Sequence, residues 1–185
     1  MVFSCVSGCS DCCIYREYYP SLEFGKIGVL ILPEEKQRLE RLARKKGLAL
    51  RIIPRLAVGL KGPEKIIAYQ MMGKNADGDL CPFLDLEGDL APHGGLRCSI
   101  YKDRPAACSA YPVISEKPVG LDAHCRFCKK HSTTTADRDG LQHELESLSK
   151  IRAAVKAEDK LHIWRYATAT GTEKNMLAEG WVLEI

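Results

Sequence analysis

Short apolar runs separated by polar, glycine-containing turns make up the first half of this 185-residue chain. Such runs lie at residues 28–32, 48–58 and 65–72, and the second and third of them, which contain β-branched side chains, each predict a strand. Pro54 lies within the second run, and a proline cannot donate a hydrogen bond to a neighbouring strand. The strand at residues 48–58 is therefore expected at a sheet edge or at a bulge.

A surface helix is predicted between residues 33 and 47. Pro33 suits the first helical turn, two glutamates follow it at the positive end of the helix dipole, and a glycine closes the segment. Leu39, Leu42 and Ala43 form a narrow apolar stripe. The rest of the helix surface is basic and is best interpreted as a solvated face, formed by Lys36, Arg38, Arg41, Arg44, Lys45 and Lys46.

From Thr135 onward the pattern becomes helical. Apolar residues recur every three or four positions, which predicts an amphipathic helix of about five turns that Asp137 could cap. This stripe consists of Leu141, Leu145, Leu148, Ile151 and Val155. A second short helix is expected around residues 160–168, and the end, GWVLEI, is expected to form a strand.

These patterns predict an α+β fold. Residues 1–133 are expected to form a small, metal-centred, cysteine-rich domain of short strands and irregular loops. Residues 134–185 are expected to form a helical C-terminal extension, which packs on that domain or on a partner protein. The partner prediction is another protein that binds through the C-terminal helix.

The composition of the chain limits which classes of function are expected. The net charge is +3, from 27 basic and 24 acidic residues, which is too balanced to predict a nucleic-acid partner from charge alone. No apolar run reaches the roughly 18 residues of a membrane span, and the start lacks the pattern of a signal peptide. A cytoplasmic location is therefore expected. The sequence contains no serine-hydrolase elbow, phosphate loop or dinucleotide fingerprint.

Nine cysteines change this picture most. An odd number cannot all form intramolecular disulfides, and a reducing compartment favours metal-binding or catalytic thiols. The N-terminal loop has the spacing Cys5-x3-Cys9-x2-Cys12, which suits three thiolate ligands of one metal centre. A second pair, Cys125-x2-Cys128, has the spacing of a metal knuckle. Thiolates bind zinc or the iron of iron–sulfur clusters, so both metals remain candidates.

The complete cysteine pattern resembles a known family. The chain reads Cys9-x2-Cys12-Cys13, then Cys81-Pro-Phe-Leu, then Cys98-x-Ile-Tyr-x2-Arg-Pro-x2-Cys108-x2-Tyr-Pro, and finally Cys125. This order is similar to that of the zinc- or iron-chelating family named for its CxxCxxCC motif, over about residues 1–130. The chain departs from the motif at its start, where three residues rather than two separate the first pair of cysteines. The ligand set that the resemblance implies is Cys5, Cys9, Cys12, Cys13, Cys81, Cys98, Cys108 and Cys125, with Cys128 as an extra thiol.

Several residues near these cysteines could support a metal. Arg104 is expected to donate charge and hydrogen bonds to the thiolates, or else to pair with Asp103 or Glu116. Tyr101 and Tyr111 are expected to pack over the site. His124 and His131 could complete a small zinc site with Cys125 and Cys128, but surface or core placement is the simpler interpretation. The acidic residues Asp85, Glu87 and Asp89 are expected to shape a solvated turn.

Three functions are consistent with the sequence. The first is an iron–sulfur protein, with a 4Fe-4S cluster, that acts in electron transfer or as an auxiliary or maturation factor. It is favoured by the three-thiolate loop and by Cys81-Pro82, a pairing typical of ferredoxin-type sites. The second is a structural zinc module without catalysis. The third comes from the resemblance, because flagellin lysine methylases share the motif, and it implies methyl transfer.

Overall fold

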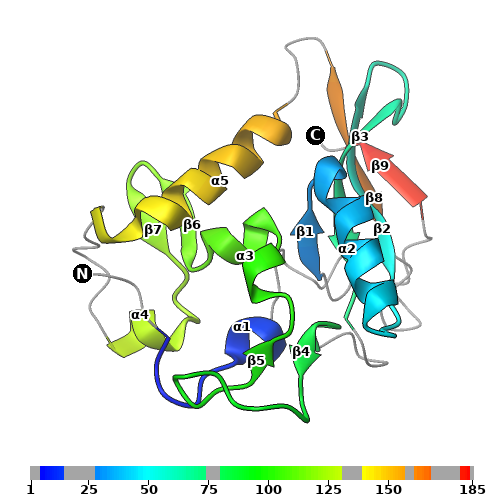
Figure 1. Cartoon of the computed structure of the whole chain (residues 1–185). Helices are drawn as coiled ribbons and strands as arrows, with labels where there is room; N and C mark the ends of the chain where they lie inside the picture. The colour runs from blue at the N-terminus through cyan, green and yellow to red at the C-terminus, as the bar shows by residue number, and fades with distance from the viewer. Residues whose placement is uncertain are drawn as a thin grey trace, which may run out of the picture.

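The computed structural model describes residues 5–14, 28–73, 80–130, 139–156, 161–167 and 180–183. Within these ranges helices and sheets are both present, so the predicted α+β class is confirmed. Figure 1 shows a sheet with one helix in front of it, a group of short elements around α1, and a longer helix, α5, that runs over α3 from beside β6 and β7 toward the sheet. No helix within these ranges is long and apolar enough to cross a membrane.

The main sheet has five antiparallel strands in the order β1-β3-β2-β8-β9. Its strands are β1 (Val29–Ile31), β2 (Ile52–Gly59), β3 (Lys65–Met71), β8 (His162–Ala167) and β9 (Gly180–Leu183). The two strands predicted in the first half, now β2 and β3, and the C-terminal strand β9 are confirmed, whereas β1 forms from the apolar run at residues 28–32, for which no strand was predicted. Pro54 lies in an interior strand, because β2 pairs with both β3 and β8, so the edge prediction is wrong. The alternative is confirmed, since the pairing with β3 shifts between Pro54 and Leu56.

The prediction of a helix around residues 160–168 is wrong. Residues His162–Ala167 form β8 and pair with the Leu56–Gly59 end of β2. Isoleucine, tryptophan and tyrosine side chains in this segment favour an extended backbone that packs on a sheet. The division into domains at residues 133 and 134 stays a prediction, and β8 joins a sheet whose first three strands precede that boundary.

Helix α2 (Pro33–Lys45) covers the sheet as predicted. Leu39 and Ala43 are buried in a core cluster with β1 and β3 residues, among them Ile31 and Met71. The helix ends at Lys45, and two residues later the chain turns at Gly47, whose φ of 65° lies in the left-handed region that glycine adopts without strain. Periodicity therefore placed the buried face of this helix correctly.

The remaining elements are short. They are α1 (Asp11–Ile14), β4 (Leu84–Asp85), β5 (Arg97–Cys98), η1 (Tyr101–Asp103), α3 (Ala106–Ala110), β6 (Val113–Glu116), β7 (Val119–Leu121) and α4 (Arg126–Lys130). Strands β4 and β5 pair with each other, as do β6 and β7. All nine cysteines lie in these elements or in the loops beside them.

Helix α5 (Gln142–Ala154) follows the short turn η3 (Asp139–Leu141) and buries the predicted stripe. Leu141 and Leu145 pack with Val113, whereas Ile151 contacts the core under α2 and Val155 contacts the cluster beneath β2 and β3. The expected capping residue Asp137 lies outside the described residues. Partner binding through this helix stays a prediction, and within the chain its apolar stripe already packs on the protein's own core.

Candidate metal centre

The N-terminal cysteine loop is held by the loop that precedes β5. The Gly8 amide donates to the His93 carbonyl at 2.8 Å, and His93 Nε2 lies 2.9 Å from the Cys9 carbonyl oxygen. The Leu96 amide donates to Ser10 Oγ at 2.7 Å. A Cβ atom on Gly95 would lie 2.1 Å from the Cys9 carbonyl oxygen, so only glycine permits this approach. These bonds fix the backbone of Cys9 against a segment more than 80 residues away in the sequence.

Cys81 and Cys98 are joined to the same loop through the backbone. The Cys81 amide donates to the Cys13 carbonyl at 2.8 Å. Cys81 then accepts from the Leu84 amide at 3.0 Å, and Leu84 pairs with Cys98 across β4 and β5. Three separate segments of the chain therefore bring their cysteines to one place.

Cys108 is positioned through a buried carboxylate. Glu35 is 5% exposed, and its Oε1 accepts a 2.8 Å hydrogen bond from the Ala106 amide at the start of α3. Its Oε2 accepts from the Leu32 amide at 2.9 Å, at the start of α2. One carboxylate thus satisfies free amides at two helix starts and fixes α3, which carries Cys108, against α2. The sequence predicted only a first-turn glutamate here, because no local pattern links positions 35 and 106.

The last two cysteines lie at α4, with Cys125 directly before the helix and Cys128 within it. Cys125 and Cys128 are both buried. Arg126 Nε donates to Asp11 Oδ2 at 2.7 Å, so residues inside the two Cys-x2-Cys spacings form an ion pair with each other. This pair ties α4 to α1 at the edge of the N-terminal loop.

Electrostatic interactions among the thiols connect this set. Cys12 and Cys13 Sγ atoms lie 3.9 Å apart. This hydrogen bond, followed by burial and the charges of Cys12, Cys81 and Cys108, raises the pKa of Cys13. Burial also raises the pKa of Cys98, and the charge of Cys108 adds to it. Five of the predicted ligands are therefore electrostatic neighbours at the inner end of the site.

The outer end of the site contains the remaining thiols. Although Cys5 reaches solvent, desolvation of its thiol, followed by the charges of Cys12, Cys9 and Cys125, raises its pKa to about 11. Burial, followed by the charge of Cys125, raises the pKa of Cys128 to about 12. All eight predicted ligands thus belong to one network of neighbouring thiols, in which Cys12 lies between the inner and the outer end. Cys128 joins it through Cys125.

The thiol groups suit a soft or borderline metal by their chemistry. Their side chains, however, are not arranged around a common metal position. None of the nine cysteines forms a disulfide. Within the described ranges, no group of three or more His, Cys, Asp or Glu side chains is arranged so that it could hold a metal ion. Burial and mutual charge favour the protonated thiols, so metal binding requires loss of protons and convergence of the sulfur atoms.

Arg104 lends positive charge to the site, as predicted. Its charge lowers the pKa of Cys5 and of Cys98, against the larger effect of burial. Its Nε donates to Ser109 Oγ at 3.1 Å, and its guanidinium group lies 4.2 Å from the centre of the Tyr101 ring. The alternative carboxylates have other partners, because Asp103 pairs with Arg38 and Glu116 pairs with Arg152.

Other expected neighbours of the site lie elsewhere. Tyr101 is 64% exposed, so its predicted role as a cover over the thiols is wrong. His124 is exposed and pairs with Asp122 at 3.1 Å, in agreement with surface placement, and His131 lies outside the described residues. Asp85 accepts hydrogen bonds from two amides of its own turn, in agreement with the solvated-turn interpretation.

Comparison with known proteins gives one match. A family model described as "CxxCxxCC: Putative zinc- or iron-chelating domain" matches residues 4–133, which include all nine cysteines. No curated protein and no solved structure matches the chain.

Proposed function

Because the chain belongs to the CxxCxxCC family, whose description is zinc- or iron-chelating, we propose that its cysteine network holds an iron–sulfur cluster that serves electron transfer or cluster maturation. The observation that supports this proposal is the convergence of thiols from four separate segments. Cys81, Cys98 and Cys108 also pack against the main hydrophobic core, which would shield a cluster on one side. Cys5 is exposed, so the opposite side of the site reaches the surface.

The residues of the site have distinct roles in this proposal. The thiolates would ligate iron, with the inner group of Cys12, Cys13, Cys81, Cys98 and Cys108 as the first candidates. Arg104 would offset part of the negative charge that thiolates and cluster bring, which makes the reduced state easier to reach. Glu35 and the Asp11–Arg126 pair would hold the ligand-bearing segments in place. The cluster, when bound, supplies the one-electron chemistry.

A structural zinc site is the second candidate, and one distance favours it. Four thiolates placed tetrahedrally around zinc, with Zn–S bonds of about 2.3 Å, have sulfur atoms roughly 3.8 Å apart. The 3.9 Å between Cys12 and Cys13 Sγ is close to that spacing. Methyl transfer has no support beyond the resemblance to the methylases.

Anaerobic purification followed by elemental analysis and absorption spectroscopy tests these alternatives. The proposal expects a brown protein with broad absorption near ~400 nm and about four iron atoms per chain. A colourless protein with stoichiometric zinc would establish the second candidate instead. A preparation with neither metal, after reconstitution with iron and sulfide and separately with zinc, would contradict both.

A further inference from the structure

The positive charge of this protein is concentrated in one segment. Seven basic and three acidic residues lie between positions 33 and 51, a net charge of +4, whereas the whole chain carries only +3. The rest of the chain is therefore slightly negative. From position 41 to position 51 there are five basic residues and no acidic one. We call this group, Arg41, Arg44, Lys45, Lys46 and Arg51, the α2 basic end.

Ion pairing divides α2 into two parts. In its first part, Lys36 pairs with Glu40, and Arg38 pairs with Asp103 and also lies near Glu35. The five side chains of the α2 basic end are all exposed, and none of them has a carboxylate partner among the residues that the structure describes. Their charge is thus uncompensated within the described part of the chain. A carboxylate supplied by another molecule would find these cations unpaired.

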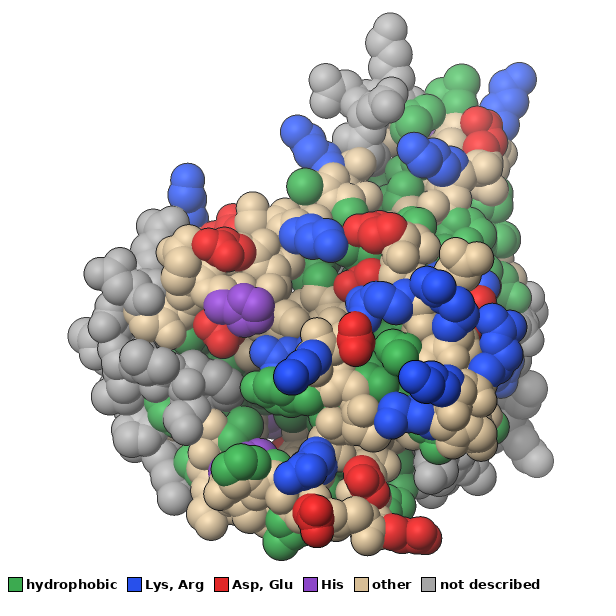
Figure 2. All heavy atoms as spheres, viewed as in Figure 1, with side chains coloured by type: hydrophobic (Ala, Val, Ile, Leu, Met, Phe, Trp, Pro, Cys, Tyr) green, Lys and Arg blue, Asp and Glu red, His purple; other side chains and the backbone are tan. Residues whose placement is uncertain are grey.

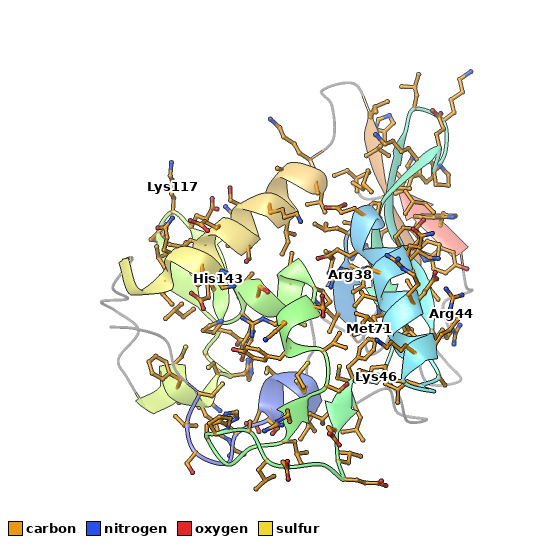
Figure 3. The ribbon with its side chains drawn as sticks, in the orientation of Figure 1. Arg38, Arg44, Lys46, Met71, Lys117 and His143 are labelled. Atoms are coloured by element: carbon orange, nitrogen blue, oxygen red, sulfur yellow. The ribbon has the colours of Figure 1, made fainter. Side chains whose placement is uncertain are left out.

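Three of these side chains lie on one face of α2. Arg41, Arg44 and Lys45 are spaced three and four residues apart, so they share one helix face. Figure 2 shows basic side chains gathered over α2, and Figure 3 shows Arg44 and Lys46 at the end of the helix, with Arg38 on the side toward α3. A row of guanidinium and ammonium groups on a rigid helix suits bidentate and point contacts with carboxylates.

The α2 basic end and the cysteine-bearing segments share one hydrophobic core. Leu48 and Leu50, in the loop that continues the α2 basic end, pack against the same core cluster as Cys81, Cys98 and Cys108. The first part of α2 is fixed to α3 through Glu35 and to η1 through Arg38, which donates to the Asp103 carbonyl. A molecule that docks on the α2 basic end would therefore bind an element whose buried face belongs to the same core cluster as the thiol-bearing segments.

We propose that the α2 basic end is the docking surface for an acidic face of a partner protein. A nucleic acid is the less suitable occupant. The overall pI of about 8.3 is below the range typical of nucleic-acid-binding domains, and the α2 basic end contains no aromatic side chain on which a base could stack. Weak, charge-steered encounters through small surfaces are typical of redox partners. The proposal stands on charge and packing and holds whichever metal the thiols bind.

The test compares binding of three fluorescent probes to the full chain at 50 mM and 150 mM salt. The probes are a 20-residue poly-L-glutamate peptide, a 20-nucleotide single strand of DNA and a 20-base-pair DNA duplex. The test variant carries Arg41→Gln, Arg44→Gln, Lys45→Gln and Lys46→Gln. The control variant carries Lys61→Gln, Lys65→Gln, Lys117→Gln and Lys156→Gln, which removes the same charge from exposed positions elsewhere, including Lys117 at the β6–β7 turn (Figure 3).

We expect the peptide to bind the unmodified protein in 50 mM salt, with an affinity that falls at least tenfold in the test variant and less than twofold in the control. Binding should weaken in 150 mM salt, because exposed charges are screened. Metal content and circular dichroism should match in the three proteins, which separates this result from any failure of the metal site. Absence of peptide binding, or equal losses in both variants, would overturn the proposal. Tighter binding of either DNA through the α2 basic end would overturn it in favour of a nucleic-acid surface.

Discussion

The sheet with α2 and the cysteine-bearing elements are held together in different ways. Strands β2 and β3 have eight and seven residues, and α2 has thirteen, with a continuous apolar core between them. On the cysteine side, β4 and β5 have two residues each, α1 has four, and α3 and α4 have five. Elements this short form too few internal hydrogen bonds to be stable alone.

On the cysteine side, long-range polar contacts add to the core that Phe83, Ile100 and Ala107 share with α2 and the sheet. The Asp11–Arg126 ion pair, the Glu35–Ala106 hydrogen bond and the Cys13–Cys81 backbone bond each join segments far apart in the sequence. Such contacts contribute little each, about 0.5–3 kcal/mol. The comparison teaches that long paired strands stabilise one part of the molecule, whereas the short elements of the other part depend on the shared core and on long-range contacts, and we expect a bound metal to add to their stability.

Metal removal should give the largest effect and the sharpest test of this difference. A structural metal contributes about 10–16 kcal/mol in zinc-finger peptides, so chelation should loosen the cysteine side by an amount on that order. Hydrogen exchange followed by mass spectrometry should show loss of protection in α1, β4, β5, α3 and α4. Protection in β2 and β3 should persist. Equal loss in both parts would mean that they form one cooperative unit, and the comparison would fail.

Replacement of single ligands should give the next largest effect. Cys98→Ser and Cys108→Ser exchange a soft thiolate for a weak hydroxyl ligand, and each should lower metal affinity by more than ~100-fold, or about 3 kcal/mol. Metal content per chain and the chelator concentration at half removal measure this loss. Cys128→Ser is the matched control, because Cys128 lies outside the predicted ligand set. Full metal occupancy in the Cys98 and Cys108 variants would remove both residues from the site.

The sequence predicted those features of the fold that depend on the pattern of residues close together in the chain. Periodicity placed the α2 stripe, most strands of the sheet and the α5 stripe, because one face of each element must be apolar. The family resemblance likewise implied a shared site for Cys12, Cys81 and Cys108, because the order of the cysteines in this chain is similar to that of the family motif. The structure brings these three into one network.

Long-range contacts were not predictable in this way. The second role of Glu35 depends on its distance from Ala106 in the folded chain, and the Asp11–Arg126 pair on the position of α4. Neither contact leaves a local signal. The apolar residues of β8 fit both the helical and the strand period, because the run is so short. Only the place of β8 beside β2 decides between the two structures.

A cavity in the sheet should affect stability but not metal binding. Ile67 is 6% exposed and packs with Leu56, Val58 and Ala68, in a cluster that contains no cysteine. Ile67→Ala should cost about 2–5 kcal/mol of unfolding free energy, measured by urea denaturation of the metal-loaded protein. Metal content should stay unchanged. If this variant loses metal in proportion to its stability, the two parts are not independent.

Glu35 connects the two parts, and its replacement should have the smallest effect. Glu35→Ala leaves the Ala106 and Leu32 amides without their acceptor, at a cost of about 1–3 kcal/mol. Glu34→Ala is the matched control. Glu34 is exposed and its only described ion pair, with Lys150 at 3.6 Å, lies at the surface, so its loss should stay within about 0.5 kcal/mol. Because Ala106 begins the helix that carries Cys108, Glu35→Ala should also speed hydrogen exchange in α3 while leaving β2 protected. Equal exchange in α3 of both variants would show that Glu35 stabilises α2 alone, and that the cysteine side is positioned without it.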